Sequence, residues 1–103
     1  MMLKINKTFN DEVINEFYYN GHGLGFIKII DIETQEEYKY YVLIPTKDIR
    51  EQVWHIDEDG YAVNEDGVYL HDFIRNPKDN ERVIHKDGNI HNNKLTNLKV
   101  VKK

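Results

Sequence analysis

Apolar and polar positions alternate over several short stretches of the chain, separated by polar connections. The stretches 25–32 and 37–44 are rich in β-branched and aromatic residues and flank a polar tetrapeptide, which predicts a β-hairpin. The stretches 54–57 and 61–63 flank an Asp-Gly turn and predict a second hairpin. Alternation at 3–5 indicates one more short strand near the start of the sequence.

Three other stretches have helical signals. A threonine followed by acids and by apolar residues at helical spacing predicts a short amphipathic helix over 9–19. Thr46 is placed to cap a second short helix over 47–53. A third is expected to begin at His71 and to end before Asn76 and the proline that follows it.

Two features of the first half allow more than one interpretation. The glycine-rich stretch 21–25 could suggest a phosphate loop, but β-rich sequence follows it instead of a helix, so we interpret it as a turn. Tyr38, Tyr40 and Tyr41 lie on one predicted strand. Such rings can stack on nucleobases, yet on a sheet they more often cover a core, which is the placement we expect here.

The composition fits one small soluble domain. The 103 residues include no cysteine, which excludes disulfides and thiolate zinc sites. No apolar run reaches the length of a membrane span, and the first residues lack the apolar core of a signal peptide. We therefore expect a protein of the host cytoplasm, with no membrane association.

Charge divides the chain into two parts. Fourteen Lys and Arg against eighteen Asp and Glu give a net charge of −4. Residues 82–103 hold six basic residues and one acid, a net of +5, so residues 1–81 hold eight basic and seventeen acidic residues, a net of −9. An acidic surface of this kind can imitate a phosphate backbone, although acidic surfaces also serve solubility alone.

Part of the acidic charge gathers on the two Asp-Gly turns of the second hairpin region. A calcium loop would need an ordered pattern of oxygen ligands, which these turns lack. A solvated rim and a patch that faces a partner are the remaining interpretations. The residues concerned are Asp57, Glu58, Asp59, Glu65 and Asp66.

Two turn motifs occupy the last third of the chain, VIHKDGN at 83–89 and NNKLTNL at 92–98. His85 ends one apolar run, and Asn97 precedes the next. With the aromatic hairpin and the Leu-His pair that come before them, these motifs resemble the HNH endonucleases, and most of all the small phage-encoded homing-type members. The resemblance covers residues 68–103.

The resemblance implies a ββα-metal unit, in which two strands and a helix surround a divalent metal and a histidine acts as general base. On this sequence His85 matches the base and Asn97 the structural asparagine. The expected fold class is α+β, a small antiparallel sheet or hairpins with short helices, followed by a truncated HNH-like unit without its final helix. The expected domain is 1–103, with an acidic β-rich part at 1–67 and an HNH-like part at 68–103.

The sequence departs from the family pattern where metal and phosphate are bound. Ile84 stands where the family usually has an acidic ligand, and it has no oxygen to offer a hard cation. Asp72 replaces a phosphate-binding arginine, which reverses the sign of that contact. The sequence also stops where the second strand should end. His85 and Asn97 are therefore expected to be vestigial, with no catalytic residue, metal ligand or cofactor.

These departures favour a degenerate HNH-like binding protein, encoded by a phage or mobile element, over an enzyme. The expected activity is inhibition of a host nuclease or ribonucleoprotein of a defence system, as in anti-CRISPR proteins, through protein contact, with weak or no direct DNA binding. A homo-oligomer is compatible with this scheme. The expected binding residues are Asp57, Glu58, Asp59, Glu65, Asp66, Asp72, Arg82, Lys86 and Lys94.

Three alternatives remain open. The chain could be an active HNH nicking or homing endonuclease in which His85 and Asp87 hold Mg²⁺ or Mn²⁺ and a further ligand comes from elsewhere. It could instead be a DNA-binding protein that uses the basic stretch 82–103, with an affinity that falls steeply with salt. Finally, His85 and His91 could form a zinc or nickel pair, although two ligands do not make a stable site.

Overall fold

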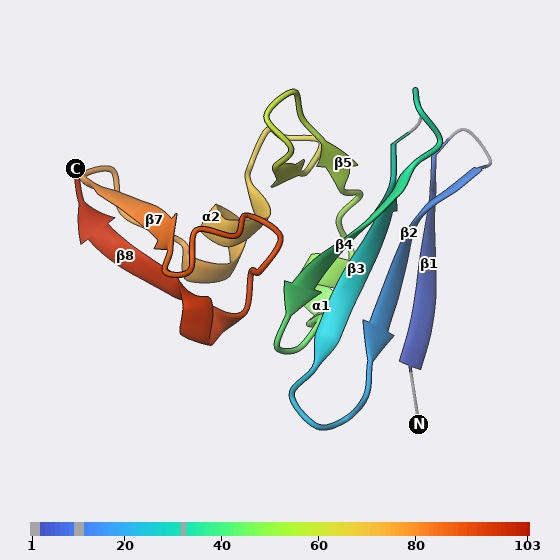
Figure 1. Ribbon diagram of the computed structural model, residues 1–103, viewed down its shortest axis with the longest axis horizontal. Helices are drawn as coiled ribbons and strands as arrows, with labels where there is room; N and C mark the ends of the chain where they lie inside the picture. Colours follow the sequence, from blue (N-terminus) through green and yellow to red (C-terminus); the bar gives the residue numbers. More distant parts are fainter. Residues whose placement is uncertain (1–2, 10–11, 32) are drawn as a thin grey trace.

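The computed structural model describes residues 3–9, 12–31 and 33–103 (Figure 1). Its largest element is an antiparallel sheet in the order β1-β2-β3-β4, and each of two further hairpins has its own pair of strands. The expected α+β class, with antiparallel hairpins and short helices, is confirmed. The elements are β1 Leu3–Phe9, β2 Glu12–Tyr19, β3 Gly25–Ile30, β4 Glu37–Val42, α1 Lys47–Arg50, β5 His55–Ile56, β6 Ala62–Val63, α2 Leu70–Arg75, β7 Glu81–His85, η1 Leu95–Asn97 and β8 Leu98–Lys102.

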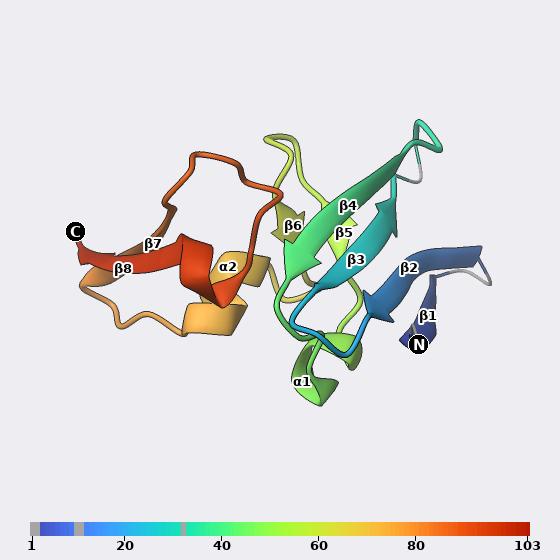
Figure 2. The same ribbon diagram turned by 60° about the horizontal axis from the view of Figure 1, so that its bottom comes forward.

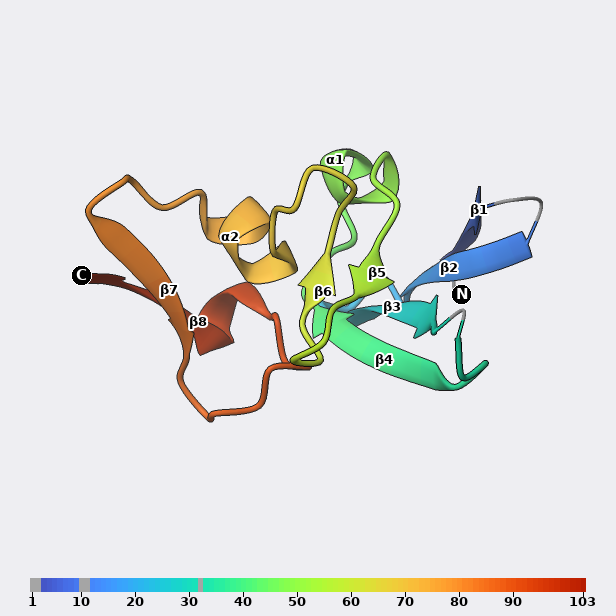
Figure 3. The same ribbon diagram turned by 90° about the horizontal axis from the view of Figure 1, so that it is seen from above.

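One face of the four-stranded sheet forms the core. The side chains of β3 alternate, so that Ile27 and Ile29 are fully buried while Phe26 and Lys28 lie on the other face. Helix α1 and the β5–β6 hairpin cover the buried face (Figure 3). The core cluster extends into α2 and so joins both halves of the chain. It consists of Phe17, Ile27, Ile29, Tyr40, Val42, Ile49, Trp54, Ala62 and Leu70.

The tyrosines of β4 divide between the two faces of the sheet. Tyr40 is fully buried in the core, as expected. Tyr41 is paired with Phe26 and meets that ring at its edge, with the centroids 6.0 Å apart, so the expected core placement is wrong for this residue. The Lys39 ammonium lies 5.1 Å from the centre of the same Phe26 ring.

The helix predicted over 9–19 is wrong, because residues 12–19 form strand β2; residues 10–11 lie outside the described part. This stretch contains valine, isoleucine, phenylalanine and two tyrosines, which favour a strand where neighbours can pair on both sides. Its pairing with both β1 and β3 satisfies its backbone and outweighs the apparent helical spacing. The glycine-rich stretch 21–25 connects β2 to β3 as the predicted turn, which the Asn20 N–H closes by donating to the Leu24 carbonyl at 3.0 Å.

Helix α1 begins where predicted and is shorter than predicted. The Thr46 hydroxyl accepts a hydrogen bond from the Ile49 N–H at 3.5 Å, so the expected cap is confirmed. The helix ends at Arg50, and the Ile49 carbonyl near its end accepts a hydrogen bond from the Trp54 indole N–H at 3.0 Å. The side chain of Trp54 is fully buried.

A loop from the second half of the chain pairs with the edge of β4. The Tyr41 N–H donates to the His91 carbonyl at 2.7 Å, and the Asn93 N–H donates to the Tyr41 carbonyl at 2.8 Å. The His91 ring stacks on Tyr40 with the centroids 4.4 Å apart. Figure 2 shows this loop, between β7 and η1, reaching across to β4. The loop thereby fastens the C-terminal hairpin to the sheet.

Helix α2 provides the other attachment of the C-terminal hairpin. Arg75, in its last turn, donates from Nε and Nη2 to the Leu98 carbonyl at 3.0 and 2.7 Å, and from Nη2 to the Leu95 carbonyl at 3.0 Å. The helix ends at Asn76, whose φ of 48° is left-handed. Over the described ranges, neither this helix nor any other is long and apolar enough to cross a lipid bilayer.

Candidate functional site

The end of β7 and the start of β8 lie side by side, which brings His85 and Asn97 to one turn. His85 is paired with Leu98, the first residue of β8, in an antiparallel ladder. The Lys86 N–H then donates to the Asn97 carbonyl at 2.8 Å. The two residues singled out in the sequence are therefore neighbours in space, although eleven residues separate them along the chain.

Asn97 holds this turn together through its side chain, which is almost completely buried. Its amide nitrogen donates to Asp87 Oδ1 at 2.9 Å and to the Asn92 carbonyl at 2.8 Å, and its amide oxygen accepts from the Asp87 N–H at 3.2 Å. One side chain thus fixes both ends of the loop that follows β7. The role that these contacts give Asn97 is structural.

The Asp87 carboxylate is held inside the same turn. It accepts hydrogen bonds from the Asn89 N–H at 2.8 Å, from Asn97 Nδ2 at 2.9 Å and from Asn92 Nδ2 at 3.0 Å. These donors stabilise the ionised form, with the Asn89 backbone N–H contributing most, and hold the pKa of this carboxyl below its ordinary value. Asp87 is therefore a charged acceptor at the centre of the loop.

His85 is oriented by a buried amide. Its Nε2 lies 2.8 Å from Asn93 Oδ1, and Asn93, which is 2% exposed, is itself held by a 3.2 Å hydrogen bond from its Nδ2 to the Ile90 carbonyl. Because an amide oxygen only accepts, the imidazole donates from Nε2. In the neutral ring the free lone pair then lies on Nδ1.

His85 belongs to a cluster of four rings, which we call the ring cluster, formed with His71, Tyr69 and Tyr61. The His71 ring meets His85 at its edge, with the centroids 5.0 Å apart, and stacks on Tyr69 at 5.2 Å with an interplanar angle of 9°. Burial lowers the pKa of His71, the nearby His85 ring adds to this effect, and Asp72 opposes it. The ring cluster lines an open cavity of about 470 Å³.

The residues around His85 do not fit a hard divalent cation. Mg²⁺ and Mn²⁺ prefer several oxygen ligands. The side chain of Ile84, 36% exposed on the adjacent position of β7, offers only carbon. The Asp87 carboxylate is engaged by three donors, and His85 Nε2 is engaged by Asn93. Across the described residues, no group of three or more His, Cys, Asp or Glu side chains is arranged to hold a metal ion.

His91 lies in a different environment from His85. Its ring stacks on Tyr40, and its Nδ1 donates to the Lys39 carbonyl at 3.2 Å. These contacts give His91 a docking role against β4. Among the predicted site residues, Asp72 lies beside the ring cluster, with its Oδ1 3.6 Å from His71 Nε2.

The acidic residues divide into two groups. Asp57 and Glu58, on the β5–β6 turn, line a cavity of about 380 Å³ together with Asp31 and Glu33 from the β3–β4 turn. We call this cavity, with its four acidic lining residues, the acidic cavity. The sequence interpretation missed Asp31 and Glu33, because only the tertiary fold brings the two turns together. The other predicted acids are outside its lining; they are Asp59 on the β5–β6 turn and Glu65 and Asp66 on the turn after β6.

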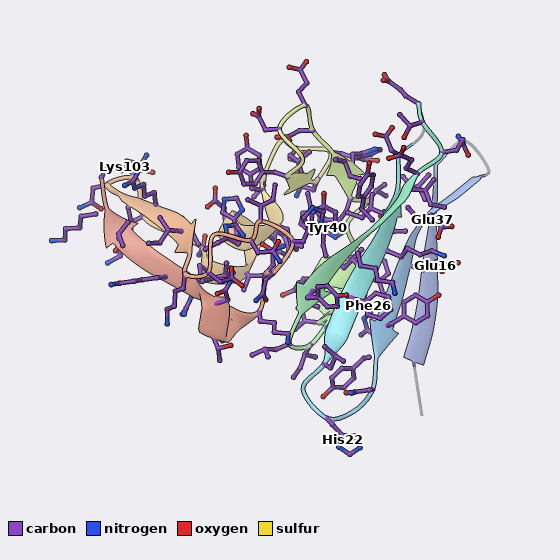
Figure 4. All side chains as sticks on the ribbon, in the orientation of Figure 1. Glu16, His22, Phe26, Glu37, Tyr40 and Lys103 are labelled. Atoms are coloured by element: carbon purple, nitrogen blue, oxygen red, sulfur yellow. The ribbon has the colours of Figure 1, made fainter. Side chains whose placement is uncertain are left out.

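The predicted basic residues lie on the β7–β8 hairpin and its loop. Arg82 lines the cavity of the ring cluster, and Lys86 and Lys94 are on the loop between the strands. None of the three forms an ion pair within the described part of the chain. Figure 4 shows Lys103 at the end of this hairpin, far from Glu16, Phe26 and Glu37 on the sheet.

The sequence interpretation also assigned no role to Asn93 or Tyr69. Asn93 was visible as part of an asparagine pair, but only its burial shows that it orients His85. No protein-family model, curated protein or solved structure matches this chain.

Proposed function

We propose that this chain is a binding protein built on an HNH-like unit that does not cut nucleic acid. In this proposal it is encoded by a phage or mobile element and inhibits a host defence enzyme that acts on nucleic acid. The state of Asp87 carries the proposal. Asp87 is the only acidic side chain in the sequence 82–103, and its carboxylate already accepts three hydrogen bonds within the turn. The stretch 82–103 therefore has no second acid to offer a catalytic ion at His85.

The acidic cavity supports contact with a nucleic-acid-handling enzyme. Two turns far apart in the sequence bring Asp31, Glu33, Asp57 and Glu58 around one hollow. Enzymes that hold nucleic acid do so in channels of opposite charge, so a hollow rimmed by carboxylates is electrostatically complementary to such a channel. If this chain occupied the channel of the target enzyme, the nucleic-acid substrate could not bind there.

The β7–β8 hairpin supplies a second surface of opposite sign. Arg82, Lys86 and Lys94 are without ion pairs among the described residues, and residues 82–103 carry a net charge of +5. If the target is a ribonucleoprotein, this surface can contact its nucleic acid while the acidic cavity contacts its protein. The division of charge thus suits a nucleoprotein target.

Inhibition assays test this function. The chain is titrated into cleavage reactions of purified RNA-guided and restriction-type defence nucleases. For a susceptible enzyme we expect the half-inhibitory concentration to rise about tenfold or more when Asp57→Asn and Glu58→Gln are combined. The matched control combines Asp48→Asn on α1 with Glu51→Gln directly after it, which remove the same charge elsewhere. Equal inhibition by both double variants, or inhibition of no nuclease, would contradict the proposal.

A plasmid-nicking assay tests the missing catalysis. With Mg²⁺ or Mn²⁺ present we expect the wild-type chain and His85→Ala to leave supercoiled plasmid equally intact. Nicking by the wild-type chain that disappears in His85→Ala would overturn the proposal.

That outcome would instead support a metal-dependent HNH nicking or homing endonuclease. One observation favours this alternative: His85 and Arg82 line the same open cavity, and Arg82 forms no ion pair with another described residue. In that case calorimetry should detect uptake of Mg²⁺ or Mn²⁺ that weakens in both His85→Ala and Asn97→Ala. An absence of uptake would exclude this alternative.

A further inference from the structure

The cavity beside β7 has the size and lining of a small-ligand site. Its volume of about 470 Å³ falls within the range of roughly 300–1,000 Å³ that is usual for such sites. Its walls combine the ring cluster with one cation and with aliphatic side chains. The lining residues used below are Tyr61, Tyr69, His71, Arg82, His85 and Ile90.

The ring cluster forms an aromatic wall. Tyr61 lies against three other rings, with centroid distances of 5.4 Å to Tyr69, 5.6 Å to His71 and 6.5 Å to His85. Tyr69 and His71 are nearly parallel. The four rings come from β5–β6, the start of α2 and the end of β7, so tertiary packing assembles the wall. The Tyr61 ring is tilted by 57° to His71, and the His85 ring by 72°. A planar heterocycle can therefore stack on one ring of this wall at a time, largely without regard to which base it is.

Arg82 supplies the cation. It is exposed on β7, lines the cavity and forms no ion pair within the described part of the chain. A guanidinium presents a planar fork of donors that matches two oxygens of one phosphate group. No carboxylate is among the residues that line this cavity. Acids lie next to the lining: Asp72 Oδ1 is 3.6 Å from His71 Nε2, and Asp57 hydrogen-bonds Tyr69.

We propose that this cavity binds a nucleoside monophosphate without a metal ion, with the phosphate at Arg82 and the base against Tyr61 and the rings next to it. Asp57 of the acidic cavity hydrogen-bonds Tyr69, so the two cavities adjoin, but they have different lining residues. The proposed ligand site therefore goes beyond the proposed inhibition and does not rest on it. A ligand that fits both the aromatic wall and the Arg82 cation has a planar ring and one anionic group at its end.

Calorimetry tests the ligand class directly. AMP, GMP, CMP and UMP are titrated into the full chain in the presence of EDTA, with adenosine and inorganic phosphate as partial ligands. We expect at least one nucleotide to bind about tenfold or more tightly than adenosine or phosphate, because each partial ligand lacks one half of the contact. Phosphate binding as tight as that of the nucleotides, no nucleotide binding, or binding only after Mg²⁺ replaces EDTA would overturn the proposal.

Two variants locate the site. Arg82→Gln should weaken nucleotide binding about tenfold or more, whereas Lys102→Gln removes the same charge from the same hairpin and should leave binding within about twofold. Equal weakening in both variants would show non-specific attraction and overturn the assigned site. Urea unfolding of each variant shows whether it is folded.

Histidine NMR signals give a readout that does not depend on substitution. Addition of the nucleotide should shift the imidazole signals of His71 and His85. The exposed His22, on the turn between β2 and β3, serves as the internal control and should not move. Shifts confined to His22 or His91 would place the ligand elsewhere and refute the proposed site.

Discussion

Asn15 on β2 hydrogen-bonds both backbone polar groups of Trp54, thirty-nine positions further along the chain. Asn15 Nδ2 donates to the Trp54 carbonyl at 2.8 Å, and the Trp54 N–H donates to Asn15 Oδ1 at 2.7 Å. Both residues are fully buried. The amide thus satisfies a stretch of irregular backbone in the core, where an unpaired group would be costly.

The first prediction concerns this pair. Asn15→Ala leaves the buried N–H and carbonyl of Trp54 without partners, and we expect it to lower the free energy of unfolding by about 2–4 kcal/mol. Asn80→Ala, at an exposed position, should change it by no more than about 0.5 kcal/mol. Urea unfolding followed by Trp54 fluorescence measures both. Equal effects would show that the pair contributes little.

The second prediction concerns Arg75, which joins α2 to the segment before β8. Arg75→Lys keeps the charge but loses the fork that reaches the Leu95 and Leu98 carbonyls, so we expect a loss of about 1–3 kcal/mol in unfolding free energy. Arg50→Lys, in the last turn of α1, is the control and should be close to neutral. A neutral Arg75→Lys would mean that the α2 attachment depends on packing alone.

The third prediction concerns pH. The pKa of Asp87 is lower in the folded chain than its ordinary value of 3.8, so the unfolded chain binds the proton more readily. The stabilisation is therefore complete above pH 3.8 and is lost as pH falls through the lower folded pKa. Acid unfolding should show this loss for the wild type and for Asp79→Asn, but not for Asp87→Asn. If all three chains lost stability identically at low pH, the contribution assigned to Asp87 would be contradicted.

The fourth prediction concerns the close approach of β3 to the chain after β4. A Cβ at Gly25 would lie 2.7 Å from Pro45 Cδ and 3.1 Å from the Tyr18 carbonyl oxygen. The proline ring cannot rotate away, so Gly25→Ala should lower the unfolding free energy by about 1–3 kcal/mol. Adding Pro45→Ala removes the closer contact and should recover part of the loss in a double-mutant cycle. No recovery would assign the strain to Tyr18.

Local sequence signals predicted most of the secondary structure because they have short-range causes. The β3–β4 hairpin, the Thr46 cap and the Asp-Gly turns depend on residues within a few positions of one another. Residues 12–19 were assigned wrongly because helical spacing and strand alternation are hard to separate in so short a stretch. The burial of Asn15, Phe17 and Ile14 and the pairing of β2 on both sides depend on partners distant in the sequence.

The candidate site was predictable only in outline. The resemblance of the two turn motifs to the HNH family implied that His85 and Asn97 belong to one unit. The ring cluster and the acidic cavity could not be foreseen, because their members come from separate elements that meet only after packing. Asn93 shows the same limit, since its place inside the fold decides what it does.

The pairing of the 89–93 loop with β4 occupies part of one edge of the four-stranded sheet. The loop pairs with the β4 edge at Tyr41. Strand β1 forms the opposite edge of this sheet among the described strands. A strand at an edge presents unpaired N–H and carbonyl groups to a neighbour. Within the four-stranded sheet, β4 is thus already paired at Tyr41, and two copies that meet antiparallel through β1 would form a symmetric pair.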